Sequence, residues 1–231
     1  MWAAGYVVES NYLVPEGVVV GCGELERASV CVGEEGRFTN ARFELDEPAV
    51  RKLFDEHGWS WDDNPFVGSR ELAGLKILVM LLSNWDNKDV RDVARGSNTA
   101  IFEHEAEDGA IEAHYLIIDW GATMGRWGIP GLRGKWDPVA FADQSPQLVT
   151  GVAGEIVSWG YVGQRTDDAI QGITVDDVRW LLGTVGRITD AQVGAALEAA
   201  GATPEERETF TRALRQRIDR LRSIIEEGSR G

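Results

Sequence analysis

Two short polar clusters follow apolar segments and carry the residue types best suited to chemistry. The first is SNWDNKD, from Ser83 to Asp89, and the second lies within IIDWGATMG, from Ile117 to Gly125. Carboxylate and amide oxygens are preferred ligands of Mg²⁺, and a carboxylate can orient an attacking hydroxyl. Phosphoryl transfer needs these groups and little covalent chemistry from the protein. Together the two clusters predict a phosphoryl-transfer site.

The spacing within the clusters matches two motifs of protein kinases, Asp-x-Lys-x-x-Asn and, after a short hairpin, Asp-Phe-Gly. Asp86 and Lys88 provide the Asp-x-Lys spacing, and Asp119 begins an Asp-Trp-Gly. Each cluster alone is also typical of an ordinary helix or strand end, where Asp and Asn side chains cap backbone groups. The combination of the two, in this order, favours the kinase-like interpretation.

The motif spacing identifies the second metal ligand less directly. The fifth position after Asp86 holds Arg91 where the motif has Asn, but residues 90–96 read as an insertion. Without that insertion, Asn98 takes the required position. Asn98 is therefore the predicted ligand, with Asp89 or Asp92 as the alternative.

The elements around the clusters predict how they are positioned. An apolar helix, RELAGLKILVMLLSNW, leads into the first cluster and is expected to be buried on most sides. Two strands, NTAIFEHE and AHYLIIDW, are joined by an acidic turn and form a predicted hairpin between the clusters. This order of elements is the order found in the kinase catalytic region.

The rest of the chain divides into a β-rich beginning and a helical end. Residues 1–45 contain short strand-like segments such as ASVCVG, and EPAVRKLFDEHG, from Glu47 to Gly58, predicts a helix. Residues 128–146 predict a long loop, and residues 145–160 a helix or a strand. The end of the chain predicts three helices with threonine caps, at Thr174, Thr189 and Thr203. In the last of them one face is apolar, and the Arg and Glu residues populate the other face.

Several segments also resemble a largely uncharacterised bacterial family with the pattern NWDxKDxNN…YxVxDLGATFG. These segments are GLKILVMLLSNWDNKD, SNTAIFE, YLIIDWGATMG and SWGYVGQ, and the resemblance extends over nearly the whole chain. The motifs are similar to the C-terminal lobe of the protein-kinase-like superfamily, in its HipA-like and lipid-kinase-like branches. The resemblance implies an α+β, protein-kinase-like fold. A partial β-rich N-lobe would cover residues 1–46, and a mainly helical C-lobe with the catalytic-loop hairpin would cover residues 47–231.

By this resemblance, the site would use ATP with Mg²⁺ or Mn²⁺ and transfer a phosphoryl group to a hydroxyl of an unknown substrate. Asp86 would be the catalytic base, and Lys88 would neutralise charge on the transferred group. Asn98 and Asp119 would hold the metal ion. A basic cluster after the second motif would bind the cofactor phosphates or an acidic substrate; its members are Arg126, Arg133 and Lys135, of which Arg126 and Lys135 are the predicted cofactor-binding residues.

The segment before Asp86 lacks the usual nucleotide-gripping motifs. It contains no G-x-G-x-x-G and no V-A-I-K-like strand, so activity is expected to be reduced or lost. A misassigned start, a truncated gene and a reduced nucleotide grip would each explain this. Two other functions stay open: a non-catalytic kinase-like module that binds a protein partner, and a metal-dependent hydrolase that uses Asp86, Asp89 and Asp119.

Composition excludes several other classes of function. The 231 residues include 38 acidic and 23 basic side chains, which give a net charge of −15 and argue against nucleic-acid or anionic-membrane binding. Cys22 and Cys31 are not spaced for a zinc site. The sequence shows no secretory signal and no membrane-spanning apolar run, so a cytoplasmic protein is expected.

Overall fold

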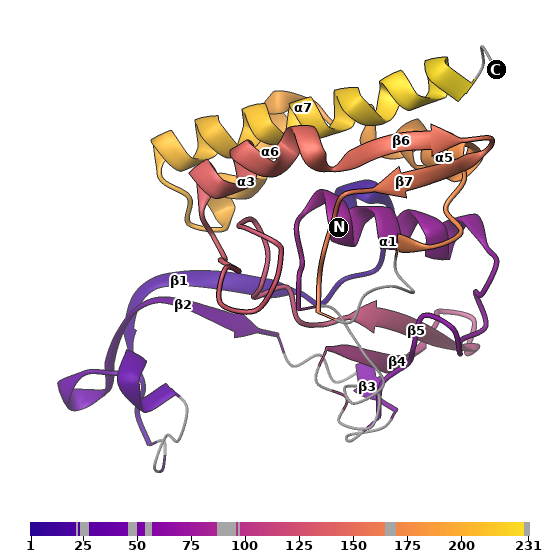
Figure 1. Ribbon diagram of the computed structural model, residues 1–231. Helices are drawn as coiled ribbons and strands as arrows, with labels where there is room; N and C mark the ends of the chain where they lie inside the picture. Colours follow the sequence, from indigo (N-terminus) through magenta and orange to yellow (C-terminus); the bar gives the residue numbers. More distant parts are fainter. Residues whose placement is uncertain are drawn as a thin grey trace.

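The structure is a computed structural model that describes residues 1–21, 23, 28–45, 50–53, 57–86, 96, 98–164 and 170–228. In these residues helices lie on one side of the molecule and small antiparallel sheets mainly on the other (Figure 1). This mixture of helices and antiparallel sheets agrees with the predicted α+β class.

Helix α1 (Arg70–Leu81) lies at the centre, between the other helices and the lower sheets (Figure 1). Its first turn begins at Ser69, whose side chain accepts a hydrogen bond from the backbone N–H of Leu72. Ile77, Val79 and Met80 are fully buried, as the apolar sequence of this helix predicts. The other helices that pack in this layer are α3 (Pro138–Gln144), α5 (Val175–Val185), α6 (Asp190–Ala199) and α7 (Pro204–Gly228).

Reciprocal side-chain caps define where the last three helices begin. The side chains of Thr174 and Asp177 exchange hydrogen bonds with each other's backbone N–H groups, and Thr189 and Gln192 do the same. At α7 the Thr203 hydroxyl accepts from the N–H of Glu206, whose carboxylate accepts from the N–H of Thr203. The threonine caps predicted from the sequence are therefore confirmed.

Three small sheets complete the described structure. The first pairs β1 (Asn11–Val18) with β2 (Arg37–Glu44). The second has the order β3–β4–β5, with β3 (Val50–Lys52), β4 (Thr99–Glu105) and β5 (Ile111–Ile117), and it confirms the hairpin predicted between the two polar clusters. The third pairs β6 (Val149–Ala153) with β7 (Ile156–Trp159). Short 3₁₀ turns are η1 (Trp2–Ala4), η2 (Ala28–Cys31), η3 (Glu34–Gly36) and η4 (Ser145–Gln147).

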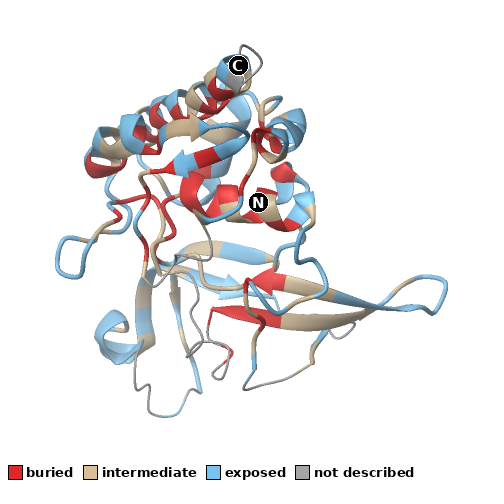
Figure 2. Cartoon of the chain, turned by 45° about the vertical axis from the view of Figure 1, so that its right-hand side comes forward, coloured by how far each residue is buried: buried red, intermediate tan, exposed pale blue. Residues whose placement is uncertain are grey.

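Burial differs sharply between the layers (Figure 2). The buried residues concentrate in the helices and at one end of the β4–β5 hairpin, whereas β1 and β2 contain none. The main core includes aromatic and aliphatic side chains from α1, α3, α5, α7 and the β6–β7 hairpin. Because apolar burial is the main favourable contribution to folding, this layer supplies most of the stability.

Several secondary-structure predictions were wrong. Val50–Lys52 is a strand, because this segment pairs with β4, and such pairing outweighs helix propensity; residues 46–49 and 54–56 lie outside the described residues. The expected strand ASVCVG contains the exposed turn η2 instead. The expected loop contains α3, which begins after the N-cap Asp137. Residues 145–160, left open between helix and strand, form η4 and the β6–β7 hairpin.

None of the described helices combines the length and the apolar character needed to cross a bilayer.

Candidate functional site

Asp86, Asn98 and Asp119 lie around one junction, where the end of the α1 segment meets both strands of the β4–β5 hairpin. The pairing of Thr99 with Ile117 places Asn98 beside the exit of β5. The Asn98 backbone carbonyl accepts hydrogen bonds from the N–H groups of Ile118 at 2.9 Å and of Asp119 at 3.5 Å. The Asn98 side chain donates to the backbone carbonyl of Asp86 at 2.8 Å. Three predicted site residues that are distant in sequence are thus linked directly.

Asn84 adds a second link across the same junction. Its side-chain amide donates to the backbone carbonyl of Asp119 at 3.0 Å, and the residue is fully buried. Its Oδ1 atom is also buried and has no hydrogen-bond partner among the described residues. Sequence reasoning missed this residue, although its position two residues before Asp86 in the Asn-Trp-Asp motif was a signal.

The turn between α1 and Asp86 has an unusual backbone. Ser83 adopts a positive φ of 57°, which is uncommon for a residue with a side chain. The N–H groups of Ser83 and Asn84 return to carbonyls of the last helical turn, at 3.0 and 2.9 Å. This tight turn sends the chain from the buried helix directly to the hairpin.

Arg217 of α7 stabilises that turn from inside the core. Its guanidinium donates to the Leu81 carbonyl and the Ser83 hydroxyl, each at 2.8 Å, and also to the Phe141 carbonyl at 2.8 Å and the Ser145 hydroxyl at 2.9 Å. Burial lowers the pKa of Arg217 to about 9, so the side chain is still charged at neutral pH. The sequence pattern placed the arginines of this helix on its solvent face; Arg217 is fully buried instead.

Trp85 and Arg133 form the other side of the junction. The Arg133 guanidinium lies over the Trp85 ring at 5.4 Å from its centroid and donates to the Gly163 carbonyl at 3.1 Å. The Trp85 indole N–H donates to the Gly134 carbonyl at 2.8 Å. Arg133 therefore holds neighbouring loops together, which differs from the phosphate contact expected of the basic cluster.

Tyr161 reports on the electrostatics near Asp86. Its hydroxyl donates to the backbone carbonyl of Asn84. Burial raises the pKa of Tyr161; the negative charge of Asp86 raises it as well, whereas the positive charge of Arg133 opposes both effects. The Asp86 carboxylate therefore lies close enough to this buried phenol to influence its ionisation.

The turn at Asp119 fixes the carboxylate through its own backbone. The Asp119 Oδ1 atom accepts from the N–H of Gly121 at 2.7 Å, and the Trp120 indole N–H donates to the carbonyl of Ile117 at 2.8 Å. A Cβ atom at position 121 would lie 3.0 Å from Asp119 Oδ1. Glycine therefore suits the turn.

Arg126 and Lys135 are the predicted cofactor-binding residues, and both are described. The side chains of Arg126 and Lys135 are exposed. The two residues lie on loop segments that are joined by a hydrogen bond from the Gly134 N–H to the Arg126 carbonyl, at 3.0 Å. No described contact joins either one to Asp86, Asn98 or Asp119. The predicted Lys88, and the alternative ligands Asp89 and Asp92, lie outside the described residues.

Lys52 is a cation that sequence reasoning did not consider. It lies on β3, in the segment expected to be helical, and its Nζ atom lies 3.4 Å from the Gly96 carbonyl, two residues before Asn98. The strand pairing of Lys52 with Phe102 places it beside the β4–β5 hairpin. Only this pairing, which the sequence pattern did not predict, could have identified it.

The donor set of the junction fits a magnesium ion. The side-chain oxygens of Asn98 and Asp119 are hard ligands, and Asn84, whose Oδ1 atom has no hydrogen-bond partner among the described residues, is a further amide bonded to the backbone of Asp119. Within the described ranges no three His, Cys, Asp or Glu side chains are grouped closely enough to hold a metal ion. A metal ion at this junction would therefore need amide and phosphate oxygens as ligands in addition to carboxylate oxygens.

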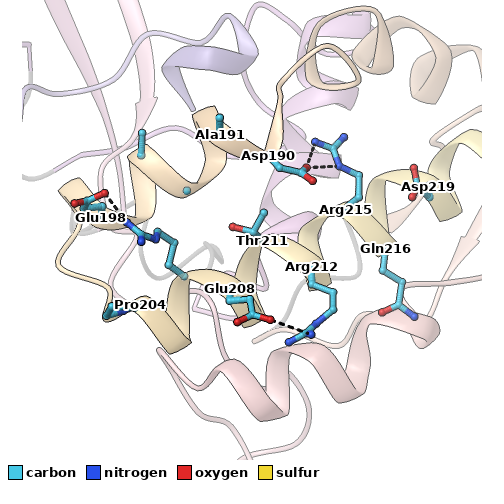
Figure 3. Close-up of a pocket in the computed structure, with 13 residues that line it drawn as sticks. Asp190, Ala191, Glu198, Pro204, Glu208, Thr211, Arg212, Arg215, Gln216 and Asp219 are labelled. Carbon is cyan, nitrogen blue, oxygen red and sulfur yellow. Dashed lines mark hydrogen bonds and ion pairs between the residues drawn. The ribbon is translucent and has the colours of Figure 1, made fainter.

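A separate groove of about 1030 Å³ lies between α6 and α7 and shares no residue with the junction (Figure 3). Arg215 pairs with Asp190 at 2.6 Å and Arg207 with Glu198 at 2.5 Å, so ion pairs bridge the two helices. Such exposed pairs are typical of a solvated helix–helix seam and contribute little energy. The groove therefore carries no candidate chemistry.

Comparison with known proteins adds no relative: no protein-family model matches the chain, and neither the curated proteins nor the solved structures give a match.

Proposed function

We propose that the protein is a kinase-like phosphotransferase that uses ATP and Mg²⁺ to phosphorylate a hydroxyl group. The observation that supports this most is the direct hydrogen bonding of Asn98 to both Asp86 and Asp119. These three residues were selected from the sequence for their motif spacing. Their meeting at one junction is what a phosphoryl-transfer site requires.

In this proposal the Asp86 carboxylate orients the attacking hydroxyl and accepts its proton. The hydroxyl oxygen forms a bond to the γ-phosphorus of ATP as the bond from that phosphorus to the β–γ bridging oxygen breaks. ADP leaves with the electrons of that bond, and the products are ADP and the phosphorylated substrate. Arg133 orients the segment around Asp86 by packing on the Trp85 ring, and Asn98 orients it through the hydrogen bond to the Asp86 carbonyl.

Asn98 and Asp119 would hold the magnesium ion, which when bound supplies positive charge against the phosphate oxygens. Asn84 supports Asp119 through the hydrogen bond to its backbone carbonyl. Lys52 is the described cation best placed to meet a phosphate, because it lies beside the segment that leads to Asn98. We therefore include Lys52 among the residues of the proposed site.

A thermal-shift experiment with ATP and Mn²⁺ tests the proposal. Binding to the native state should raise the melting temperature by several degrees at saturating ligand. Asp119→Ala should abolish the increase, because it removes a metal ligand. Asp143→Ala, which changes an exposed acid on α3, should retain the increase and is the matched control. No shift in the wild type, or equal shifts in both variants, would contradict the proposal.

A further inference from the structure

A second cavity, lined by aromatic side chains, lies beside Trp120. We propose that it binds a small organic cation with an apolar body, such as an arylalkylamine. The cavity has a volume of about 320 Å³, within the range of small-molecule sites. Its aromatic lining residues are Tyr6, Trp59, Phe66, Tyr115, Trp120 and Trp180. We call it the aromatic cavity.

The walls of the aromatic cavity come from four parts of the chain. They are the N-terminal segment, the loop before α1 with the first half of that helix, strand β5 with the turn after it, and Trp180 of α5. Tyr115 packs against Phe66 with ring centroids 5.4 Å apart and against Trp59 at 6.4 Å. The rings on this side therefore support one another as a connected wall.

Gly74 of α1 allows the opposite wall to come close. A Cβ atom at this position would lie 2.4 Å from the Tyr6 hydroxyl and 2.7 Å from the Trp180 ring. The Tyr6 hydroxyl donates to the Glu71 carbonyl at 2.7 Å, which fixes the phenol against the helix. Any larger residue at position 74 would displace Tyr6 and Trp180.

The charge of the lining favours a cation. Glu71 lines the cavity, and the described lining contains no Lys or Arg side chain. His114 also lines it, with its imidazole 3.1 Å from the Glu112 carboxylate. Burial, and then the negative charge of Glu71, raises the pKa of Tyr6, so this carboxylate acts on the cavity wall. Met1 also lines the cavity, and burial lowers the pKa of its amino group.

Aromatic faces and one carboxylate together recognise an organic cation. The electron-rich faces of Trp and Tyr attract ammonium groups, and an attached apolar body would fill the rest of the cavity. A neutral ligand of the same shape would gain only the apolar contacts. The chemistry of the cavity therefore predicts a preference for an amine over its uncharged analogue.

This inference does not rest on the proposed phosphotransferase function. Among the described residues, the aromatic cavity and the phosphoryl-transfer junction share no lining residue, although Trp120 of the cavity follows Asp119 and Trp59 is hydrogen-bonded to Thr99 beside Asn98. Asp119→Ala should therefore remove the response to ATP and Mn²⁺ without changing amine binding. The two proposals can fail separately.

The test is a titration of the full chain with phenethylamine and with 2-phenylethanol, followed through the indole N–H signals in NMR spectra. Phenethylamine should bind saturably and at least ten times more tightly than the alcohol, and it should shift the Trp59, Trp120 and Trp180 signals. Glu71→Gln should remove the preference for the amine. Glu205→Gln, an exposed acid on α7, should leave it unchanged.

A second variant tests the location. Ala113→Phe places a ring at the β5 side of the cavity, at an exposed strand position that tolerates substitution, and should block both ligands. The proposal is overturned if neither ligand binds saturably, or if the two bind equally. It is also overturned if Glu71→Gln leaves the preference intact, or if folded Ala113→Phe binds the amine as the wild type does.

Discussion

Helix α1 and the β1–β2 hairpin are stabilised in different ways. In α1, eight of twelve residues are buried, whereas β1 and β2 contain only exposed and half-buried positions. On β2 the Phe38 and Phe43 rings contact each other, with centroids 5.5 Å apart, and Phe38 pairs with Gly17 of β1 across the hairpin. Gly17 leaves room for this arrangement, because a Cβ atom there would lie 2.5 Å from the Phe38 ring.

The comparison shows where a site can be held rigidly. Asp86 follows the buried helix, and Asn98 and Asp119 lie at the end of the β4–β5 hairpin that packs beneath it. The exposed β1–β2 hairpin contributes no residue to that junction. Rigid positioning of the proposed catalytic groups therefore comes from α1 together with the β4–β5 hairpin that packs against it.

The largest effect should come from truncating the core of the helical layer. Phe210→Ala removes a fully buried ring that packs against Phe141 at 5.6 Å, and it should lower the free energy of unfolding by about 3–5 kcal/mol. Phe43→Ala in the exposed hairpin should lower it by about 1 kcal/mol or less. Urea denaturation of both variants measures the difference. Equal losses would show that the two regions are equally important for stability.

The next effect concerns the buried cation that links α7 to the turn before Asp86. Arg217→Met leaves several buried oxygens without a donor and should lower the free energy of unfolding by about 3 kcal/mol. Arg217→Lys keeps the charge but not the planar fork, so its loss should be intermediate. Arg212→Met removes an exposed arginine of the same helix and should change it by about 0.5 kcal/mol at most. An Arg217→Met variant as stable as the wild type would contradict the role assigned here.

The smallest effect is expected where the hairpin meets the rest of the molecule. The carboxyl group of Glu9 lies beside that of Glu44. Burial, followed by the contact with Glu44, raises the pKa of Glu9 to about 7, against the opposing charges of Arg42 and Lys52. Glu9 and Glu44 line a cavity with a volume of about 480 Å³, and His104 and His114 line it as well.

This raised pKa makes stability depend on pH in a definite direction. The folded state holds its proton up to about pH 7, whereas an unfolded Glu loses it near pH 4.5, so stability falls as the pH rises through 7. From pH 5.5 to 8.5 this loss should be about 1 kcal/mol after allowance for solvent screening. Urea denaturation at both pH values should show a smaller loss in Glu9→Gln. Glu16→Gln, on exposed β1, should behave as the wild type; an unchanged loss in Glu9→Gln would exclude this pair as the cause.

Sequence patterns predicted the elements whose signals are local. The apolar run of α1, the threonine caps of α5, α6 and α7, and the hairpin of β4 and β5 are all of this kind. The strand at Val50–Lys52 was missed because it exists only through pairing with β4, about fifty residues later. Helix α3 was missed because Gly and Pro residues around it favoured a loop.

The candidate site likewise contains residues that local sequence signals identified and residues whose role depends on contacts distant in sequence. Motif spacing identified Asp86, Asn98 and Asp119, which the structure brings together. It could not identify Arg217, because an arginine among many on a helix gives no sign that it points into the core. Nor could it show that Arg133 packs on Trp85, since this contact depends on how two loops fold against each other.

The central claim is that side chains around the α1–hairpin junction surround one divalent ion. Mn²⁺ bound with ATP broadens NMR signals of nearby protons, so the side-chain amide signals of asparagines and glutamines report their distance from the ion. We predict selective broadening of the Asn98 and Asn84 signals. The Gln192 side chain caps the first turn of α6, which supplies no residue to the junction, and its side-chain amide signal should stay sharp. Equal broadening of all three, or none at saturating Mn²⁺ and ATP, would contradict the claim.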